Sequence, residues 1–335
     1  MTALSVLLGD YPHTRPLKDG TIPVPGVECH WAQASPLYSA FARMVRGLEY
    51  DVCEMALATY FQAREAGVPI TLLPVAMIGG THHQSLTRLP DGPALSPRQL
   101  AGSRVGVRSY SQTTGLWVRG VLREDYGVQP SDVTWVTTEE PHVARYREPD
   151  NVRRSRAAKV ADLLRDGEVG SAVLGPRAIG TQGVELVPVL PDARAAAQAW
   201  IDRHGTVPVN HMVVVRDEVL ESAPQAVAAL VEALAAAIAT TAGERDGSPA
   251  GRVVAAGWRP ELVAAVGIGA RYALEQQVVR SPIDVERIAA HTAHLGAAPA
   301  PGSAGTTRAA RAAGTARTAE TPGTPDERDA EVSRP

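Results

Sequence analysis

Short runs of β-branched and aliphatic residues alternate along the chain with longer segments in which apolar residues recur every three or four positions. The short runs are typical of buried strands, and the longer segments are typical of amphipathic helices. The predicted strands lie at residues 4–8, 27–31, 70–77, 105–107, 133–136, 171–174 and 209–215. The predicted helices lie at residues 37–47, 57–66, 113–126, 157–165 and 193–203. This alternation predicts an α/β protein whose sheets are mostly parallel and flanked by helices.

Two stretches of the chain, beginning at Met44 and Leu164, repeat the same order of helix end, glycine, acidic residue and strand. The glycines suit helix C-termini, where a left-handed conformation is needed. We therefore predict two similar α/β lobes. The first consists of residues 1–106 and 209–295, and the second consists of residues 107–208. Small ligands tend to bind in a cleft between such lobes.

The C-terminal part of the chain changes character twice. From Pro224 to Leu295 the pattern is helical and rich in alanine, which predicts helices packed on the outside of the first sheet. Residues 296–335 are almost entirely Ala, Thr, Gly, Pro, Ser and charged types, so we expect a disordered tail. No segment approaches the roughly 20 apolar residues of a membrane span, and the first residues show no basic leader. We therefore expect a cytoplasmic protein.

Composition narrows the class of partner. The 335 residues are 44% apolar and 21% charged, and the net charge of −3 arises from interspersed acids and bases. This distribution lacks the basic stripe of a nucleic-acid-binding surface, so we expect a small-molecule ligand. Cys29 and Cys53 lie in apolar surroundings, which predicts two free buried thiols. No spacing of Cys and His in the sequence matches a zinc site.

One junction between a predicted strand and a predicted helix is suited to bind an anion. The strand at 105–107 leads into a turn rich in hydroxyl groups, which opens the next helix. The first N–H groups of a helix have no internal partner and lie at the positive end of the helix dipole, so a carboxylate can dock there. Ser109, Ser111, Thr113 and Thr114 add hydroxyl groups to this turn. The alternative is that a serine simply caps the helix.

Six separated segments between residues 4 and 295 carry recognisable motifs. They are residues 9–17 (GDYPHTRPL), 25–27 (PGV), 51–60 (DVCEMALATY), 117–120 (WVRG), 139–141 (EEP) and 208–211 (PVNH). In this order the segments resemble the 4,5-dihydroxyphthalate decarboxylase family. The resemblance implies the two-lobed type II periplasmic-binding-protein fold. It also implies a cytoplasmic, homo-oligomeric, metal-free aromatic decarboxylase. No cofactor is required if a ring hydroxyl of the substrate supplies the electrons.

Loss of CO2 from an electron-rich ring needs an anchor for the carboxylate, a proton donor for the ring carbon and a base near a ring hydroxyl. Glu54 ends a buried strand and Asp10 follows the first strand, so either carboxylate can be the base. His211 lies where the chain re-enters the first lobe, and an imidazole that titrates near neutral pH suits proton delivery. The structural alternatives are helix capping by Glu54, an Asx turn at Asp10 and a core histidine at His211.

Side chains that would hold the substrate come from both predicted lobes. Arg15 follows the first strand, and its guanidinium can hold a carboxylate with two hydrogen bonds. The alternative for Arg15 is an ion pair with an acid such as Glu54. Arg177 follows the strand at 171–174 and is a second candidate anchor, against simple surface exposure. Tyr11, Tyr60 and Tyr110 can pack against a substrate ring.

Four further residues lie near these segments. His82 and His83 stand where the family usually carries an arginine-bearing stretch. Because adjacent strand residues point to opposite faces, we expect one of the two to reach the site and assign substrate binding to His83. Trp117 shares an amphipathic helix with apolar neighbours, which predicts a core position. Arg119 lies two turns into that helix, and we expect it to form a salt bridge or to lie at an interface.

Three functions of different class follow from the sequence. The leading hypothesis is a cofactor-independent, non-oxidative decarboxylase of a hydroxylated aromatic carboxylic acid held in the interlobe cleft. The second is a binding protein on the same fold, which holds a small acid without chemistry. The third is a biosynthetic enzyme of the type that makes the thiamine pyrimidine precursor, which would carry an iron-binding or Cys-rich motif that we do not find in the sequence.

Overall fold

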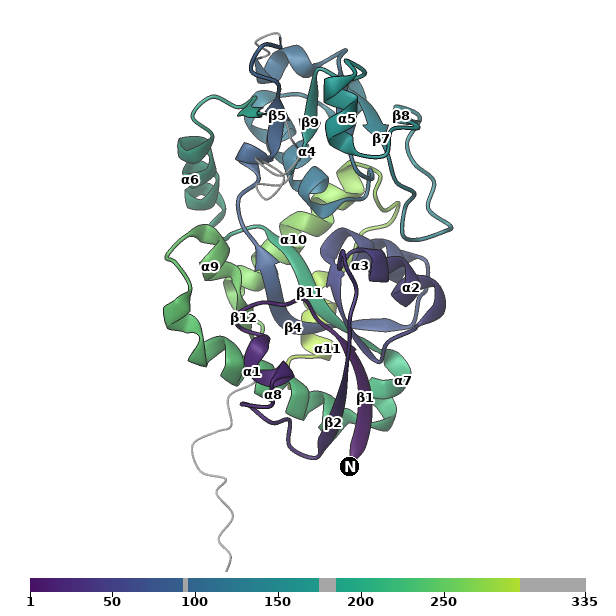
Figure 1. Ribbon diagram of the computed structural model, residues 1–335, viewed down its shortest axis with the longest axis vertical. Coiled ribbons are helices and arrows are strands. Elements are labelled where there is room, and N and C mark those ends of the chain that lie inside the picture. The colour runs from purple at the N-terminus through teal and green to yellow at the C-terminus, as the bar shows by residue number, and fades with distance from the viewer. Residues whose placement is uncertain (93–95, 175–184, 296–335) are drawn as a thin grey trace, which may run out of the picture. The chain divides into compact units, whose positions relative to one another are not determined.

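The computed structural model describes residues 1–92, 96–174 and 185–295. Within these ranges the strands form two sheets of six strands each, accompanied by helices (Figure 1). An α/β architecture of two sheets is what the alternation of strand and helix patterns predicts. The predicted tail at 296–335 and the candidate anchor Arg177 lie outside the described residues.

The first sheet is built from two separate parts of the chain. Its strands are β1 (Thr2–Leu7), β2 (Val27–Ala32), β3 (Val52–Ala56), β4 (Ile70–Gly79), β11 (Val209–Arg216) and β12 (Ala255–Ala256). Their order in the sheet is β12-β4-β11-β3-β1-β2. β1 pairs in parallel with β2 and β3, whereas β11 runs antiparallel to both β3 and β4. The sheet is therefore mixed and not mostly parallel as predicted, because the strand on which the chain returns is inserted between two strands of the opposite direction.

The second sheet is built from the middle of the chain. Its strands are β5 (Leu86–Arg88), β6 (Arg104–Val107), β7 (Thr134–Thr137), β8 (Val152–Arg154), β9 (Ser171–Val173) and β10 (Val187–Pro188). Their order is β10-β5-β9-β6-β7-β8, and β6 pairs in parallel with β7 and β9. The lobe boundary expected near residue 106 falls inside β6. By sheet membership the chain leaves the first sheet after Gly79 and returns to it at Val209.

Helices occupy the segments in which apolar residues recur with helical spacing. They are α1 (Arg15–Lys18), α2 (Ser39–Gly47), α3 (Leu57–Glu65), α4 (Thr113–Tyr126), α5 (Val160–Arg165), α6 (Ala193–His204), α7 (Asp217–Ser222), α8 (Pro224–Thr240), α9 (Pro249–Val253), α10 (Pro260–Glu275) and α11 (Val285–His291). α4 matches its predicted bounds and ends at Gly127, whose left-handed φ of 72° terminates the helix. Of the two glycines expected to end helices, Gly167 has a φ of 70°, but Gly47 lies inside α2 and Leu48 takes the left-handed position.

The helix α10 packs against α3 and also against α4, which follow strands of different sheets. Figure 1 shows α10 between the parts of the molecule that carry the two sheets. A Cβ atom on Gly120 of α4 would lie 2.0 Å from the ring of Tyr272 on α10, so the two helices approach closely because this position is glycine. Trp117 is 1% exposed and packs edge-on against Tyr272, which confirms its predicted core position.

The two segments that connect the sheets lie side by side, because β4 and β11 are neighbours in the first sheet. The backbone N–H of Gly80 donates to the carbonyl of Pro208 at 2.9 Å. A Cβ atom on Gly79 would lie 2.3 Å from the same carbonyl oxygen, so the close approach requires glycine. The indole N–H of Trp117 donates to the carbonyl of Val209 at 3.0 Å, which ties α4 to the returning strand.

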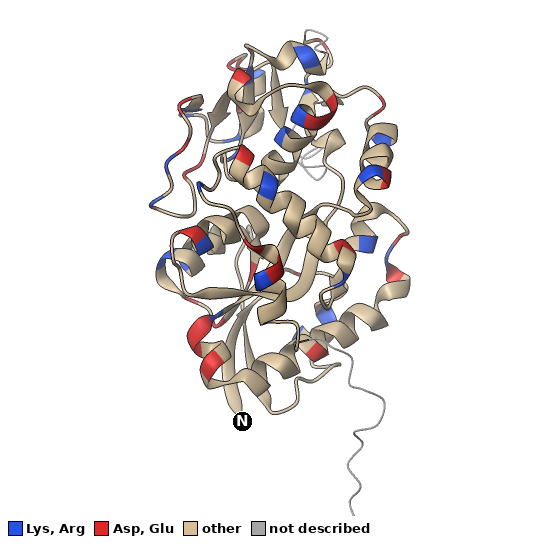
Figure 2. Ribbon diagram, turned by 180° about the vertical axis from the view of Figure 1, so that it is seen from behind, with Lys and Arg blue, Asp and Glu red and all other residues tan. Residues whose placement is uncertain are grey.

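The cysteines and the distribution of charged residues agree with the composition of the chain. Cys29 and Cys53 are both free thiols; Cys53 is buried and Cys29 is half-buried. Figure 2 shows Lys and Arg residues mixed with Asp and Glu residues on the helices of the face it presents. Among the residues that the structure describes, no helix is both long enough and apolar enough to cross a bilayer.

Candidate active site

The carboxylate of Glu54, on the central strand β3, is fully buried and accepts three hydrogen bonds. Its Oε1 atom accepts from the hydroxyl of Tyr11 at 2.8 Å and lies 2.7 Å from Nδ1 of His211. Its Oε2 atom accepts from the backbone N–H of Gly9 at 2.8 Å. A buried carboxylate needs such partners in order to remain charged. Two segments far apart in sequence, residues 9–11 and the strand that carries His211, therefore converge on one carboxylate.

The register of the first sheet places Glu54 beside His211. His211 on β11 pairs with Ala56 on β3, and Glu54 lies two residues before Ala56, on the same face of its strand. Tyr11 reaches the carboxylate from the loop after β1, in which its ring lies directly against Gly9. A Cβ atom on Gly9 would lie 2.5 Å from the Tyr11 ring, so only glycine lets the ring fold back in this way.

The hydrogen bond to Glu54 determines which atom of His211 can react. An ionised carboxylate can only accept, so Nδ1 of His211 donates to it and Nε2 is the remaining ring nitrogen. Within the described residues Nε2 has no hydrogen-bond partner. The side chain of His211 is 17% exposed, whereas that of Glu54 is 0% exposed. Nε2 is therefore the atom of this pair that a substrate can meet.

Two further histidines lie close to these residues. The ring of His13 stacks on Tyr11 with centroids 5.0 Å apart, and burial lowers the pKa of His13 to about 4 against the opposing effect of Glu54. His142 lies in the loop after β7, and its Nδ1 atom is 2.8 Å from the hydroxyl of Thr59 on α3. Burial is the largest of the effects that lower the pKa of His142 to about 4. Both imidazoles are therefore neutral near pH 7.

The sequence did not single out His13 or His142, although both lie in or beside its motifs. His13 belongs to the same segment as Tyr11, two residues further on, and His142 follows the Glu-Glu-Pro motif directly. Phe41 on α2 was also missed, and its ring contacts His142 and His211 edge-on. The adjacency of His142 to that motif was the one signal that could have identified it.

Two predicted site residues from the first loop lie apart from Glu54. Because Tyr11 turns inward, its neighbour Asp10 turns outward, where it is 86% exposed and pairs with Lys18 at 2.5 Å. Arg15 is exposed on the short helix α1, whose buried residue is Leu17. The structure brings neither side chain to the carboxylate, and it does not form the alternative ion pair between Arg15 and Glu54.

The hydroxyl groups at the start of α4 connect that helix to the first sheet and its helices. Thr113 Oγ1 accepts from the backbone N–H of Ala58 at 3.2 Å, so the N-termini of α3 and α4 lie together. Thr114 Oγ1 accepts from the side chain of Asn210 at 3.3 Å, one residue before His211. Ser111 Oγ lies 3.3 Å from another hydroxyl of the same turn and is buried. The predicted anion-binding turn therefore lies beside the strand that carries His211.

Tyr110 belongs to a buried structural cluster rather than to this group. Its hydroxyl donates to the carbonyl of Gln276 at 3.0 Å, and the Arg119 guanidinium lies 4.0 Å from its ring centroid. Arg119 is fully buried, and it donates to the Gln276 side chain at 2.7 Å and to the Tyr110 carbonyl at 2.6 Å. The expected salt bridge or interface role of Arg119 was wrong, because its side chain is buried inside the protein, where Nε and Nη2 donate to neutral acceptors and Nη1 has no partner among the described residues.

Of the two adjacent histidines, His82 rather than His83 lies beside the returning strand. Nε2 of His82 is 2.6 Å from the side-chain oxygen of Asn210, and burial lowers the pKa of His82 to about 4. His83 is buried elsewhere, with Nε2 3.9 Å from a carboxylate oxygen of Asp125 on α4. The alternation of strand faces does not apply to this pair, because His83 begins a short 3-10 helix at His83–Ser85.

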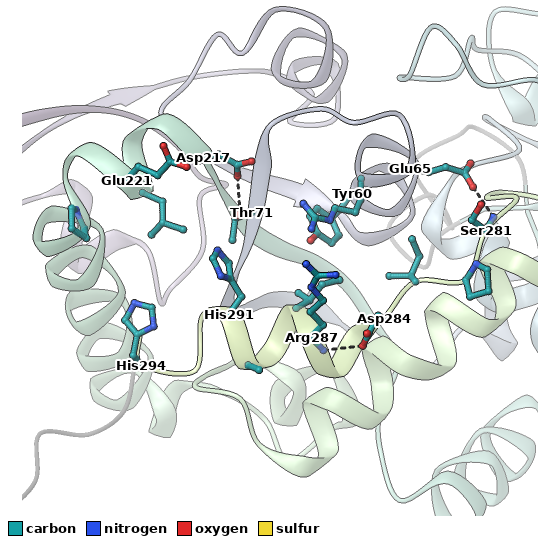
Figure 3. Close-up of a pocket in the computed structure, with 17 residues that line it drawn as sticks. Tyr60, Glu65, Thr71, Asp217, Glu221, Ser281, Asp284, Arg287, His291 and His294 are labelled. Carbon is teal, nitrogen blue, oxygen red and sulfur yellow. Dashed lines mark hydrogen bonds between the residues drawn. The ribbon is translucent and has the colours of Figure 1, made fainter.

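The described cavities are separate from the Glu54 group. A cavity of about 930 Å³ lies among α3, α7 and α11 (Figure 3). Its polar residues pair with one another: Thr71 donates to Asp217 at 2.7 Å, and Glu65 accepts from the backbone of Ser281 at 2.7 Å. A second cavity of about 330 Å³ lies beside β12 and α10. Of the described residues that the sequence suggests for the site, only Tyr60 lines one of these cavities. No three His, Cys, Asp or Glu residues among those described are grouped as metal ligands.

Comparison of the amino-acid sequence finds two similar proteins, both named 4,5-dihydroxyphthalate decarboxylase. The protein from Comamonas testosteroni is 34% identical over 242 residues, which are 69% of this chain and 73% of that protein. The protein from Pseudomonas putida is 34% identical over 209 residues, which are 59% of this chain and 80% of that protein. No family model matches the sequence.

Comparison of the fold finds solved structures with low sequence identity. The alkanesulfonate-binding protein SsuA from Xanthomonas axonopodis pv. citri has a TM-score of 0.56 at 10% identity, over 86% of this chain and 98% of that protein. The desulfurization enzyme DSZB has a TM-score of 0.53 at 14% identity, over 87% of this chain and 96% of that protein. These similarities confirm the predicted periplasmic-binding-protein fold. Because they include binding proteins and an enzyme, the fold alone assigns no chemistry.

Proposed function

Because this chain belongs to the 4,5-dihydroxyphthalate decarboxylase family and is a carboxy-lyase, we propose that it decarboxylates a hydroxylated aromatic acid of the 4,5-dihydroxyphthalate type. The reaction takes place at His211, Glu54 and Tyr11, and it uses no cofactor. The single observation that carries this assignment is the 2.7 Å contact between His211 and Glu54, which leaves one imidazole nitrogen free for substrate.

His211 protonates the ring carbon that bears the carboxylate. The bond from that carbon to the carboxylate then breaks, CO2 leaves, and the electron pair of the broken bond restores the aromatic ring. One proton is consumed for each CO2 released, and His211 regains its proton from solvent. A general acid in this position contributes roughly 10²- to 10⁴-fold to the rate. The reaction therefore needs no external electron acceptor.

Glu54 acts through His211 and does not touch the substrate. Its three hydrogen bonds occupy both oxygens, so it is a positioning residue that fixes which imidazole nitrogen faces the substrate and stabilises the imidazolium. Tyr11 holds the same carboxylate in place. This role differs from the one suggested by the sequence alone, in which Glu54 was a candidate base.

The substrate carboxylate docks at the paired N-termini of α3 and α4. The 3.2 Å contact between Thr113 and Ala58 keeps these positive helix ends together, and Thr114 contacts the residue before His211. This anchor lies between segments of the two sheets, which agrees with a ligand bound in an interlobe cleft. The cytoplasmic location and the homo-oligomeric state expected from the sequence stay predictions, and light scattering on the full chain measures the latter.

The direct test incubates the purified full-length protein with 4,5-dihydroxyphthalate and related hydroxybenzoates and measures the CO2 released. We expect release by the wild type, and a loss of about 10²-fold or more in kcat for His211→Asn. His30→Asn, at an exposed position on β2, is the matched control and should keep full activity. Tight binding of these acids by the wild type without any release of CO2 would refute the proposal.

A further inference from the structure

The loop after β7 carries His142, and side chains from α2 and α3, which flank the first sheet, hold this residue in place. The Thr59 hydroxyl on α3 lies 2.8 Å from the Nδ1 atom of His142. Arg46 on α2 donates from Nε to the carbonyl of His142 and from Nη2 to the carbonyl of Pro141, both at 2.7 Å. Side chain and backbone of His142 are therefore fixed by residues more than 80 positions away in the chain.

The same aromatic ring supports His142 and His211. Phe41 is 1% exposed, and its ring meets His142 edge-on at 5.7 Å and 89° and meets His211 edge-on at 5.2 Å and 83°. Each imidazole uses Nδ1 for a partner from the protein, the Thr59 hydroxyl in one case and the Glu54 carboxylate in the other. The described residues provide no hydrogen-bond partner for Nε2 of His142. Two imidazoles with free Nε2 atoms therefore share one support.

The charges around the two imidazoles are opposite. His211 contacts the Glu54 carboxylate, whereas the charged groups that act on His142 are Arg108 and Arg46 together with His211 itself. The guanidinium of Arg108 is held in place 3.7 Å from the ring centroid of Tyr38 and by a 2.6 Å contact with Glu139. Burial and then these cations lower the pKa of His142 to about 4, so it is a neutral proton acceptor at pH 7. A neutral imidazole supported by the same ring as an imidazole that contacts a carboxylate provides a proton acceptor beside a proton donor, which acid and base catalysis requires.

We propose that His142 is a second catalytic residue, which accepts the proton of a ring hydroxyl of the substrate while His211 protonates the ring carbon. The inference rests on the proposed function and deepens it. As the O–H bond breaks, its electron pair moves into the ring, and the ring carbon takes the proton from Nε2 of His211. Loss of CO2 returns the electron pair to the ring, and His142 gives its proton back to the oxygen. Thr59 is the positioning residue for His142.

The test compares His142→Gln with His211→Gln across pH, with His291→Gln on the exposed face of α11 as control. At neutral pH we expect His142→Gln to lower kcat by about 10²-fold or more. As pH rises into the range in which the free catechol loses its own proton, the ratio of wild-type kcat to His142→Gln kcat should decrease, because the substrate then needs no base. The corresponding ratio for His211→Gln should not decrease. Binding of phthalate, which lacks ring hydroxyls, should be unchanged in His142→Gln.

Thr59→Val provides a second measurement that keeps the volume of the side chain. It should lower kcat about fivefold to tenfold, and the deficit should narrow with pH in the same direction as that of His142→Gln. A His142→Gln protein with kcat within about threefold of wild type, or with a deficit that is constant across pH, would overturn the inference while leaving the proposed function intact. Absence of CO2 release by the wild type itself would instead overturn the proposed function.

Discussion

Replacing Glu54 with glutamine tests the central contact of the site without changing the volume of the side chain. The carboxylate accepts from Gly9, Tyr11 and His211, but an amide has only one oxygen that can accept. If that oxygen stays on the Gly9 N–H, the amide NH2 group faces Tyr11 and His211. Nδ1 of His211 must then accept, so its proton moves to Nε2 and the ring can no longer become a cation in this position.

The expected decrease in kcat of Glu54→Gln follows from the number of hydrogen bonds in which the residue 54 side chain changes from acceptor to donor. A hydrogen bond to a charged group contributes about 1.5–3 kcal/mol, and two of the three contacts to Glu54 reverse, which gives about 3–6 kcal/mol. At 1.36 kcal/mol for each factor of ten, Glu54→Gln should lower kcat by about 10²- to 10⁴-fold. KM should change much less, because the carboxylate does not touch the substrate.

The assay measures CO2 release at saturating substrate for wild type and Glu54→Gln, together with thermal unfolding of both proteins. A folded variant with the predicted loss of kcat supports the role of Glu54 in orienting His211. A variant that keeps kcat within tenfold of wild type while losing thermal stability would refute it. That result would assign Glu54 to the stability of the sheet alone.

Three further predictions follow from contacts described above. Tyr11→Phe removes one of three donors to the Glu54 carboxylate, so kcat should fall about threefold to tenfold and urea titration should show a loss of about 1 kcal/mol. Arg119→Met leaves buried acceptors unpaired and should cost about 3–5 kcal/mol in urea unfolding, with kcat of the folded protein unchanged; an unchanged urea midpoint would contradict this. Burial lowers the pKa values of His13, His82 and His142 from their ordinary value of 6.5 to about 4, so between these two pH values the unfolded chain binds protons that the native chain does not. The free energy of unfolding should therefore fall as pH falls from about 6.5 to about 4, by up to about 1.4 kcal/mol per pH unit for each histidine, and His82→Asn should reduce that slope.

Much of the fold could be predicted because long elements bury a regular pattern. The predicted helix at 113–126 coincides with α4, and the predicted strand at 209–215 differs from β11 by one residue. The strand β12 was missed, since two alanines inside an alanine-rich helical pattern have no periodicity of their own. The change of sheet after Gly79 was also missed, because it depends on which strands pair rather than on the pattern within any one strand.

The candidate site was predicted in part. Glu54 and His211 lie on regular strands, where the alternation of faces shows which side chains can meet. In the loop after β1 the Tyr11 ring lies against Gly9 while Asp10 faces solvent, and no periodicity reveals which side chain of an irregular loop turns inward. His142 meets Thr59 across 83 residues of sequence, a contact that only the folded chain establishes.

The pairing of Gly80 with Pro208 has a consequence for how such enzymes can diverge. Residues 80 and 208 lie in contact, so the segment between them begins and ends at the same place in the fold. Recombination between related genes can therefore exchange the whole segment. After such an exchange Glu54 and His211 belong to the unchanged part of the protein, whereas residue 142 comes from the exchanged segment. The proposed acid and the proposed base are therefore encoded on opposite sides of this boundary, so exchanging residues 80–208 between relatives would keep the contact of His211 with Glu54 and replace His142.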